Sequence, residues 1–255
     1  MRAAGFANIL FYYSPLALLA IAWDLSSRFN LIAPELAPSP GATLAALWTL
    51  IASGDLIEHA GVSIYRESVG LLSSIVIGTM IGIGMARIEW VRILLRPCVT
   101  FLYPMPKSAL IPILLLWFGL GHMSKIAAVF LGCLLPMVTS SYNGARGVEP
   151  QLIWSARSLG ASQWRVLWKV ILLAALPDIL SGARIALALS WLLLVAAEMM
   201  ISRNGLGFLI SYAGETGDYA TMFAGVLVVV AIGFFSDRLL LLLMRWALRW
   251  RDLPA

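Results

Sequence analysis

The chain has 255 residues, of which 61% are hydrophobic and only 12% charged, with a formal net charge of +5. Soluble domains carry roughly 25% charged residues, and the mean hydropathy here is +0.90. A soluble globular domain is therefore excluded, because no such fold could bury that much apolar surface, and the composition indicates a polytopic membrane protein.

Six apolar runs are long enough to cross a bilayer, which needs about 20 helical residues. We expect helices because the runs are continuous rather than alternating, and a spanning segment must pair its own backbone groups. The predicted fold class is an all-α transmembrane bundle of six spans. The predicted spans are Asn8–Phe29, Ala60–Ala86, Val99–Phe118, Lys125–Gly147, Leu176–Ile201 and Met222–Arg245.

The first run also resembles a secretory signal peptide, since Arg2 precedes it and Ala20-Ile21-Ala22 follows an apolar stretch. The run is longer than the usual apolar core of such a signal, and it contains Tyr12, Tyr13 and Pro15. We therefore interpret it as a retained membrane anchor.

Between the first two spans, the turn-rich Pro38-Ser39-Pro40-Gly41 is followed by an apolar stripe of Leu44, Leu47, Trp48 and Ile51. This stripe predicts a short helix that lies at the membrane interface. The predicted organisation is an accessory transmembrane helix (1–29), a periplasmic or interfacial segment (30–55) and a main transmembrane domain (56–255) with an inner loop at 148–175.

Lysine and arginine are biased toward cytoplasmic loops. With the N-terminus inside, the inner segments hold eleven of these residues and the outer segments three. We therefore predict that both termini are cytoplasmic. Anionic lipid headgroups then account for the net positive charge, and a nucleic-acid partner is not needed.

Ionisable groups within a span cost about 2.5–3.5 kcal/mol at the bilayer centre, so each needs a reason. Glu198, toward the outer end of span five, either lines a cavity or pairs with a polar group on a neighbouring helix. Arg66 and Arg184 could attract an anion; span capping and interhelical ion pairing are the alternatives. We expect Asp237 to pair with Arg238 or to reach the inner headgroups.

Span three contains Pro104, Pro106 and Pro112, which interrupt its hydrogen-bond ladder. A broken helix is tolerated where it lines a cavity or is buried in protein, so this span is a candidate for the wall of a pathway. We expect the stem of Lys107 to extend toward the cytoplasmic surface.

The loop between spans four and five predicts a helical hairpin. Pro150 suits a first helical position, and Leu152, Ala156 and Leu159 follow on one face. Gly160 can end this helix in a left-handed conformation.

The second helix of the hairpin is predicted to start with Ser162 as its cap. It carries an apolar stripe of Trp164, Leu167, Trp168 and Ile171, with basic residues on its other faces, as in a helix that lies among headgroups. Leu176-Pro177 is expected to break this helix and to turn the chain into span five.

Ala156, Leu159-Gly160 and Leu176-Pro177 resemble the loop motif of permease subunits of ATP-binding-cassette (ABC) importers. Further blocks resemble the nitrate, sulfonate and taurine branch of that family, over roughly Ser53 to Arg251. These blocks are Ser53–His59, Leu116–Gly121, Ser124-Lys125-Ile126, Val195–Met199 and Gly205-Leu206-Gly207. The chain departs from the motif at Trp154, where the family usually has glutamate, and at Ser155, where it usually has alanine.

The resemblance implies a type I ABC importer permease fold in the bacterial inner membrane, with 148–175 as the coupling loop that docks on the ATPase. The coupling residues it implies are Leu152, Trp154, Ser155, Ala156, Leu159, Gly160, Ala161, Leu176 and Pro177. The candidates for the translocation pathway are Arg66, Pro104, Pro106, Trp117, Arg184 and Glu198.

The partners implied by the resemblance are two cytosolic ATPase subunits, a second permease copy (a homodimer), a periplasmic or lipid-anchored substrate-binding protein and membrane lipids. The chain lacks the GxxxxGK[ST] phosphate loop, so no cofactor is expected on it and ATP with Mg²⁺ belongs to the partner. The implied cargo is a small anion or zwitterion such as a sulfonate, taurine, nitrate or bicarbonate, or alternatively a vitamin precursor such as a pyrimidine.

Two other classes of membrane protein would show features that this sequence lacks. A self-contained secondary transporter or channel would need inverted repeats or matching broken helices, and no internal repeat is visible in the sequence. A membrane-embedded enzyme would need a catalytic cluster near one face. The two histidines and the two cysteines, Cys98 and Cys133, have no metal-site spacing, so neither catalysis nor a metal is expected.

Overall fold

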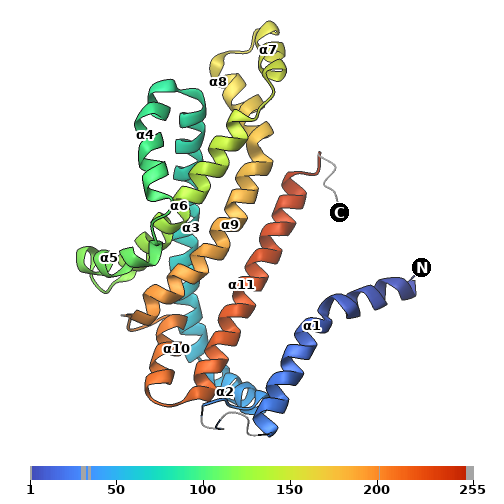
Figure 1. Ribbon diagram of the computed structural model, residues 1–255, viewed down its shortest axis with the longest axis vertical. Coiled ribbons are helices and arrows are strands. Elements are labelled where there is room, and N and C mark those ends of the chain that lie inside the picture. Colours follow the sequence, from blue (N-terminus) through green and yellow to red (C-terminus); the bar gives the residue numbers. More distant parts are fainter. Residues whose placement is uncertain (1, 30–32, 34–35, 201, 251–255) are drawn as a thin grey trace.

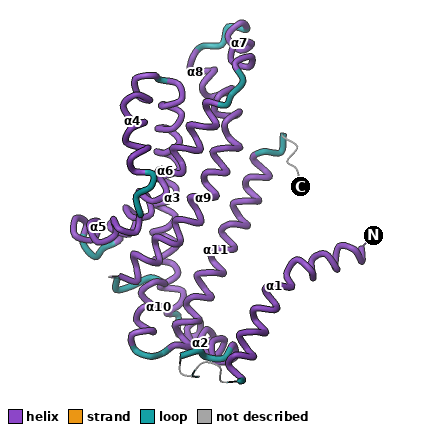
Figure 2. Tube along the Cα trace, viewed as in Figure 1, coloured by secondary structure: helices purple, strands orange, loops and turns teal. Residues whose placement is uncertain are grey.

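The computed structural model describes residues 2–29, 33, 36–200 and 202–250, and for residues 2–13 and 16 it describes the backbone alone. Within these residues every regular element is a helix (Figure 2), which confirms the all-α class. The elements are α1 (Arg2–Arg28), α2 (Pro40–Ser53), α3 (Asp55–Arg87), α4 (Glu89–Leu102), η1 (Lys107–Leu110), α5 (Ile111–Phe118), α6 (His122–Arg146), α7 (Pro150–Ser158), α8 (Gln163–Val166), η2 (Leu167–Ile171), α9 (Leu172–Met200), α10 (Leu206–Glu215) and α11 (Tyr219–Ala247).

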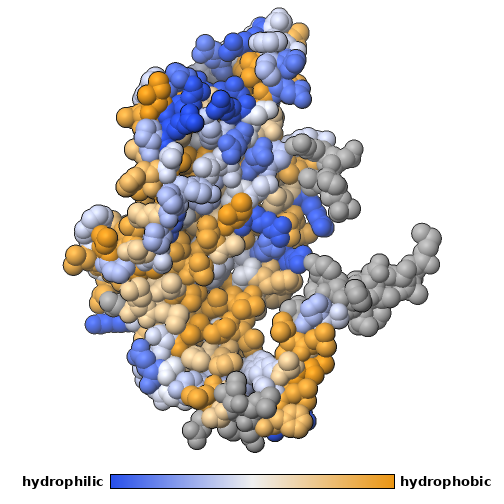
Figure 3. All heavy atoms as spheres, viewed as in Figure 1, coloured by the Kyte–Doolittle hydropathy of each residue, from blue (hydrophilic) through white to orange (hydrophobic). Residues whose placement is uncertain are grey.

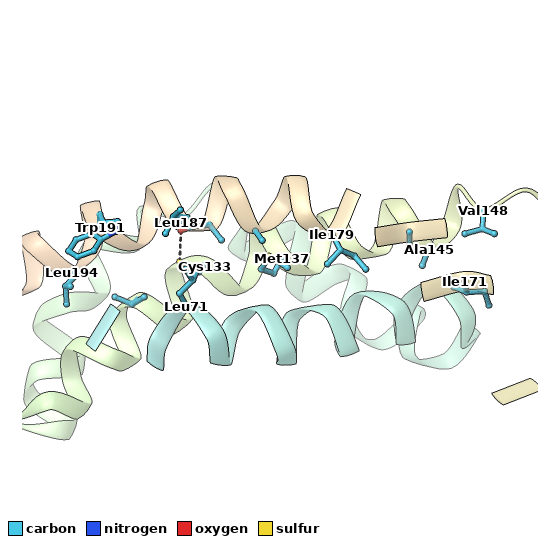
Figure 4. Packing of buried hydrophobic residues seen from close by; sticks show 14 of the residues in the cluster. Leu71, Cys133, Met137, Ala145, Val148, Ile171, Ile179, Leu187, Trp191 and Leu194 are labelled. Atoms are coloured by element: carbon cyan, nitrogen blue, oxygen red, sulfur yellow. Dashed lines mark hydrogen bonds between the residues drawn. The ribbon is translucent and has the colours of Figure 1, made fainter. Parts of the chain in front are cut away.

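The centre of the molecule is formed by α3, α6 and α9, with α6 packed against both of the others (Figure 1). Apolar side chains buried between them make the main core, where the Cys133 thiol donates to the carbonyl of Ala186 at 3.2 Å (Figure 4). At Gly82 of α3, an added Cβ would lie 2.5 Å from the carbonyl oxygen of Val138 in α6. A small residue is required there, because the two backbones approach too closely for a side chain.

The two ends of the bundle differ in character. One end of the bundle carries the hairpin of residues 148–166, which contains α7 and α8 (Figure 1). We call this end of the bundle the hairpin end, and its surface is rich in hydrophilic residues (Figure 3). The opposite end carries α2 and α10 (Figure 1). Hydrophobic residues cover much of the surface between the ends, as expected for a protein that lies in a bilayer (Figure 3).

The predicted interfacial helix is present as α2. The Ser39 hydroxyl accepts from the N–H of Ala42 at 3.2 Å, and Gly54 (φ 85°) ends the helix in a left-handed conformation. Leu44 and Trp48 remain exposed on α2, where an interfacial helix would place apolar side chains.

Four helical segments among the described residues are long and apolar enough to cross a membrane, and a bent pair makes a fifth. They cover the predicted spans two to six, except for the break at residues 103–106, for Gly147, which follows the end of α6, and for Ile201, which lies outside the described residues. The first predicted span coincides with α1, many of whose side chains lie outside the described part of the chain. The count of six therefore stays a prediction.

The third predicted span is not a single straight helix from Val99. It consists of α4, which already begins at Glu89, and of η1 with α5, and the two parts meet at 96°. The break lies at residues 103–106, where Pro104 and Pro106 interrupt the ladder, as the prolines predicted. Pro112 instead lies in the first turn of α5, where a missing N–H does no harm.

The expectation that Pro177 breaks the chain between the hairpin and span five is wrong. α8, the π-helical turn η2 and α9 form one continuous helical segment, Gln163–Met200, with Pro177 inside it. A proline inside a transmembrane helix is tolerated where local adjustments and neighbouring side chains satisfy the freed backbone groups.

Candidate coupling and transport sites

The first helix of the hairpin ends as its sequence predicts. Gly160 has φ of 80°, its N–H donates to the Arg157 carbonyl at 2.9 Å, and the N–H of Ala161 donates to the Ala156 carbonyl at 3.0 Å. These two bonds make a Schellman motif, which needs a residue that adopts the left-handed conformation cheaply. The second helix is capped by Ser162, whose hydroxyl accepts from the N–H of Arg165 at 3.3 Å.

The hairpin has an inner and an outer apolar surface. Ile153, Ala156 and Ala161 are partly buried and pack against the main core. Leu159, in contrast, is 88% exposed, and Trp154 is 63% exposed. The predicted single face of the first helix is therefore divided, because its alanine faces the core while its leucines face outward.

We call the exposed set Leu152, Trp154 and Leu159 the hairpin knob. Ser155 and Gly160 are also exposed beside it, and so is the basic residue Arg157. Leu176 and Pro177, the other two predicted coupling residues, lie half-buried in α9 beyond the hairpin and do not belong to this surface. Which residues couple to a partner stays a prediction.

A buried polar cluster lies at the opposite end of the bundle. The Arg66 guanidinium on α3 donates to the Glu198 carboxylate on α9 at 2.7 Å, and the two side chains are 2% and 0% exposed. Glu198 also accepts from the Ser63 hydroxyl at 2.8 Å and from the N–H of Gly207 at 3.0 Å. Arg66 additionally donates to the backbone carbonyl of Asn204 at 3.0 Å.

This cluster ties α3 and α9 to the connection before α10, and it also reaches α6 through His122, whose Nδ1 accepts from Arg66 Nε at 3.3 Å. The connection approaches the carboxylate so closely that a Cβ on Gly205 (φ 109°) would lie 2.4 Å from Glu198 atoms. Of the two expectations for Glu198, the structure shows the pairing with a polar group on a neighbouring helix. A role of Arg66 or Glu198 in contacting cargo stays a prediction.

Sequence reasoning did not find Ser63, His122 and Asn204 as members of the cluster. Ser63 precedes Arg66 by three residues and therefore shares its helix face, which was the one available signal. His122 and Asn204 lie far away in the sequence, and only the tertiary fold brings them to Arg66.

A second interhelical ion pair joins α9 and α11. Arg184 Nε donates to one Asp237 carboxylate oxygen at 2.7 Å, and its Nη2 donates to the other at 3.1 Å. The expected pairing of Asp237 with Arg238 is therefore wrong, since Arg238 lies over the Phe234 ring instead, at 4.8 Å from the ring centroid. Arg184, which was predicted as a pathway candidate, is half exposed.

The remaining pathway candidates lie on the broken span. Pro104 and Pro106 are exposed at the break, and Trp117 of α5 is 71% exposed. That the Lys107 stem extends toward the cytoplasmic surface stays a prediction. The Lys107 ammonium donates to the carbonyls of Tyr103 and Leu102 at the end of α4, the latter at 3.4 Å.

A helical bundle with this apolar surface and with several helices long enough to cross a membrane defines an integral membrane protein. More specifically, the chain belongs to the family of binding-protein-dependent transport system inner membrane components, whose model matches residues 74–249. It is thus a permease component of the inner membrane.

Individual relatives agree with this assignment. The chain is 35% identical over 238 residues to the putative aliphatic sulfonates transport permease protein of Bacillus subtilis, covering 93% of this chain and 86% of the relative. It is 35% identical over 240 residues to the taurine transport system permease protein of Escherichia coli, covering 92% and 87%. Its fold is similar to a chain of the inward-facing MetNI methionine ABC transporter, with a TM-score of 0.66, 19% identity and coverage of 77% and 97%.

Proposed function

We propose that this permease imports a small organic anion or zwitterion of the alkanesulfonate or taurine type. The proposal is supported by two relatives that align with nearly the whole chain, one named as a putative aliphatic sulfonates transport permease and the other as a taurine transport system permease. Delivery by a soluble or lipid-anchored substrate-binding protein is in keeping with the family, whose description names such a dependence.

In the proposed complex, two permease copies enclose the pathway and two ATPase subunits bind on the cytoplasmic side, where both permease termini also lie. ATP and Mg²⁺ are bound by the ATPase subunits. The observation that carries this proposal is the hairpin knob, because three large apolar side chains are exposed together there, at the hydrophilic end of the bundle. An exposed apolar patch of this kind marks a contact with a protein or with the membrane.

The hairpin is built to transmit a displacement. Its inner surface packs on the main core, and its second helix continues without a break into α9. A partner that moved the knob would therefore move α9 with it, since packed helices shift between discrete arrangements rather than deforming smoothly. This is the proposed link between ATP binding and alternating access.

Site-specific photocrosslinking tests the docking. With a benzophenone side chain at Leu159, we expect an ATP-dependent crosslink to the ATPase subunit in membranes. The matched control is Trp48 on α2 at the opposite end, also well exposed (71%), from which no ATPase crosslink should form. If Leu159 were to crosslink only to lipid, the docking proposal would fail.

Gly160→Arg tests coupling in the assembled importer. Nothing lies within 4 Å of the Cβ position of Gly160, so the substitution is strained by its φ of 80° rather than by lack of space. We expect normal membrane insertion, retained ATP hydrolysis and loss of substrate uptake. Uptake at the normal rate without any ATPase subunit would contradict the importer model and favour a secondary transporter.

The cargo is tested through the binding protein and through uptake. Thermal-shift screening of the cognate binding protein should give stabilisation by taurine or a short alkanesulfonate, and the reconstituted importer should take up the same compound. Stabilisation by a pyrimidine instead would overturn the proposed substrate class while leaving the permease assignment intact.

A further inference from the structure

Lys107 lies at the break of the third span, deep within the apolar part of the molecule. It begins η1, directly after the bend of 96° between the two halves of the span. Its neighbour on α6 is Gly132, where an added Cβ would lie 3.9 Å from the Cβ of Lys107. Gly132 is ten residues from the start of α6, or about 15 Å at the rise of an α-helix, which is half of a bilayer core.

The positive charge of Lys107 is not neutralised within the described part of the chain. A lysine ammonium has three donors, and two of them are directed to the carbonyls of Leu102 and Tyr103, at the end of α4. Tyr103 also places its ring beneath the charge, 5.7 Å from Nζ. None of the ion pairs among the described residues includes Lys107, so one donor and the full charge are left for a ligand.

A pocket of about 180 Å³ is lined in part by the Lys107 side chain. Its lining is mainly apolar, with side chains from the facing helices, and includes two polar residues, Lys107 and Ser108. The lining residues are Lys107, Ser108, Gly132, Leu189, Leu192 and Leu193. Gly132 keeps the pocket open in part, because a Cβ there would meet the buried Leu193 at 1.9 Å.

We propose that this pocket is a transient binding site for the anionic group of the cargo, with Lys107 as its charge-selective residue. The volume suits a short organic anion: its head would meet Lys107 and Ser108, and its carbon chain would lie against the leucines. A cation at this depth costs free energy when the site is empty, and an anion in transit recovers part of that cost. The identity of the cargo, though not the anion site itself, rests on the proposed function.

The test uses a cysteine reporter in the pocket of the full permease, reconstituted with its ATPase subunits in nanodiscs. Ser108→Cys is placed in a background in which the native Cys98 and Cys133 are replaced by alanine. Two thiol reagents are compared, the anionic 2-sulfonatoethyl methanethiosulfonate and the neutral methyl methanethiosulfonate. Leu192→Cys serves as a second reporter, because this side chain is 66% exposed and its replacement should not disturb folding.

We expect Lys107→Gln to lower the ratio of the anionic to the neutral modification rate by about fivefold to twentyfold. This range follows from the interaction of two unit charges about 5 Å apart at an effective dielectric constant between about 80, as in water, and about 40. Glutamine retains the donors that cap α4, so a purely structural role of Lys107 would alter both rates together and leave their ratio unchanged. Lys169→Gln, which removes an exposed cation on the hairpin side, should not change the ratio.

An unchanged ratio in Lys107→Gln would overturn the proposal. So would a lack of reaction of both reporters with both reagents, since the pocket would then be closed to solutes. Uptake provides a separate readout: Lys107→Gln should lower the maximal rate of taurine or ethanesulfonate uptake at least fivefold, and Lys107→Arg should restore most of it. If the unaltered importer transports neither compound, the proposed cargo fails, while the labelling ratio still decides whether Lys107 selects anions.

Discussion

Removing the charge of Glu198 should be among the most destabilising single changes in this protein. Glu198→Gln keeps the size of the side chain but leaves the Arg66 guanidinium, which is 2% exposed, without its anion. Breaking a buried pair from one side costs about 3–5 kcal/mol, because the remaining charge stays desolvated. The Ser63 hydroxyl and the N–H of Gly207 also lose an anionic acceptor, so the upper half of that range is expected.

The change is measured as the thermal midpoint of the detergent-solubilised permease, followed by the monodisperse peak in size-exclusion chromatography. At about 2–4 °C per kcal/mol for a chain of this size, Glu198→Gln should lower the midpoint by roughly 10 °C or more. The double variant with Arg66→Met should recover part of this loss, since the Arg66 charge that lost its partner is removed as well. The control is Asp24→Asn, which removes an exposed i,i+4 pair with Arg28 and should shift the midpoint by about 1 °C.

Two results would refute this reasoning. A shift for Glu198→Gln no larger than that of Asp24→Asn would mean that the carboxylate is not desolvated in the folded permease. A double variant with Arg66→Met that is as unstable as the sum of the two single variants would mean that the two side chains do not interact.

Three further predictions concern helix packing, capping and the second ion pair. Gly82→Ala should destabilise the permease by about 1–3 kcal/mol in the same thermal assay, because its Cβ would meet the α6 backbone. The control Gly61→Ala, whose Cβ would have nothing within 4 Å, should be neutral or stabilising by up to about 1 kcal/mol, and equal effects of the two variants would contradict the close contact at Gly82. Ser162→Ala should lower the stability of the capped helix by about 1 kcal/mol and so speed hydrogen exchange at the amide of Arg165 about fivefold. An unchanged exchange rate would show that Ser162 does not cap this helix. Arg184→Gln and Asp237→Asn should each lower the thermal midpoint more than the double variant does, because each single change leaves one charge without its partner. A double variant whose loss equals the sum of the two single losses would show that the pair is not formed.

The sequence predicted those parts of the fold that local signals determine. Long apolar runs placed the spans, and Pro150, Gly160 and Ser162 defined the hairpin, since helix starts and ends depend on a few neighbouring residues. The prolines also indicated the break in the third span. The angle of that break and the early start of α4 at Glu89 could not be predicted, because they depend on packing against α3 and α6.

The polar contacts were harder to predict than the helices. Glu198 was expected either to line a cavity or to pair across helices, and the choice depended on Arg66, which is 132 residues away in the sequence. Pro177 was misjudged for a related reason: a rule for isolated helices in water was applied to a proline that lies inside a long transmembrane helix, where such residues are tolerated. The partners of the Lys107 ammonium could not be predicted either, because they are the carbonyls of Leu102 and Tyr103 at the break of the span.

The unbroken run from Gln163 to Met200 gives the molecule a long lever of continuous helix. Its 38 residues correspond to about 57 Å, with the hairpin at one tip and Glu198 near the other. A tilt of this rod about its middle would swing both tips in opposite directions at once. Opening at one membrane surface would then be mechanically tied to closing at the other, without any signal having to pass from helix to helix.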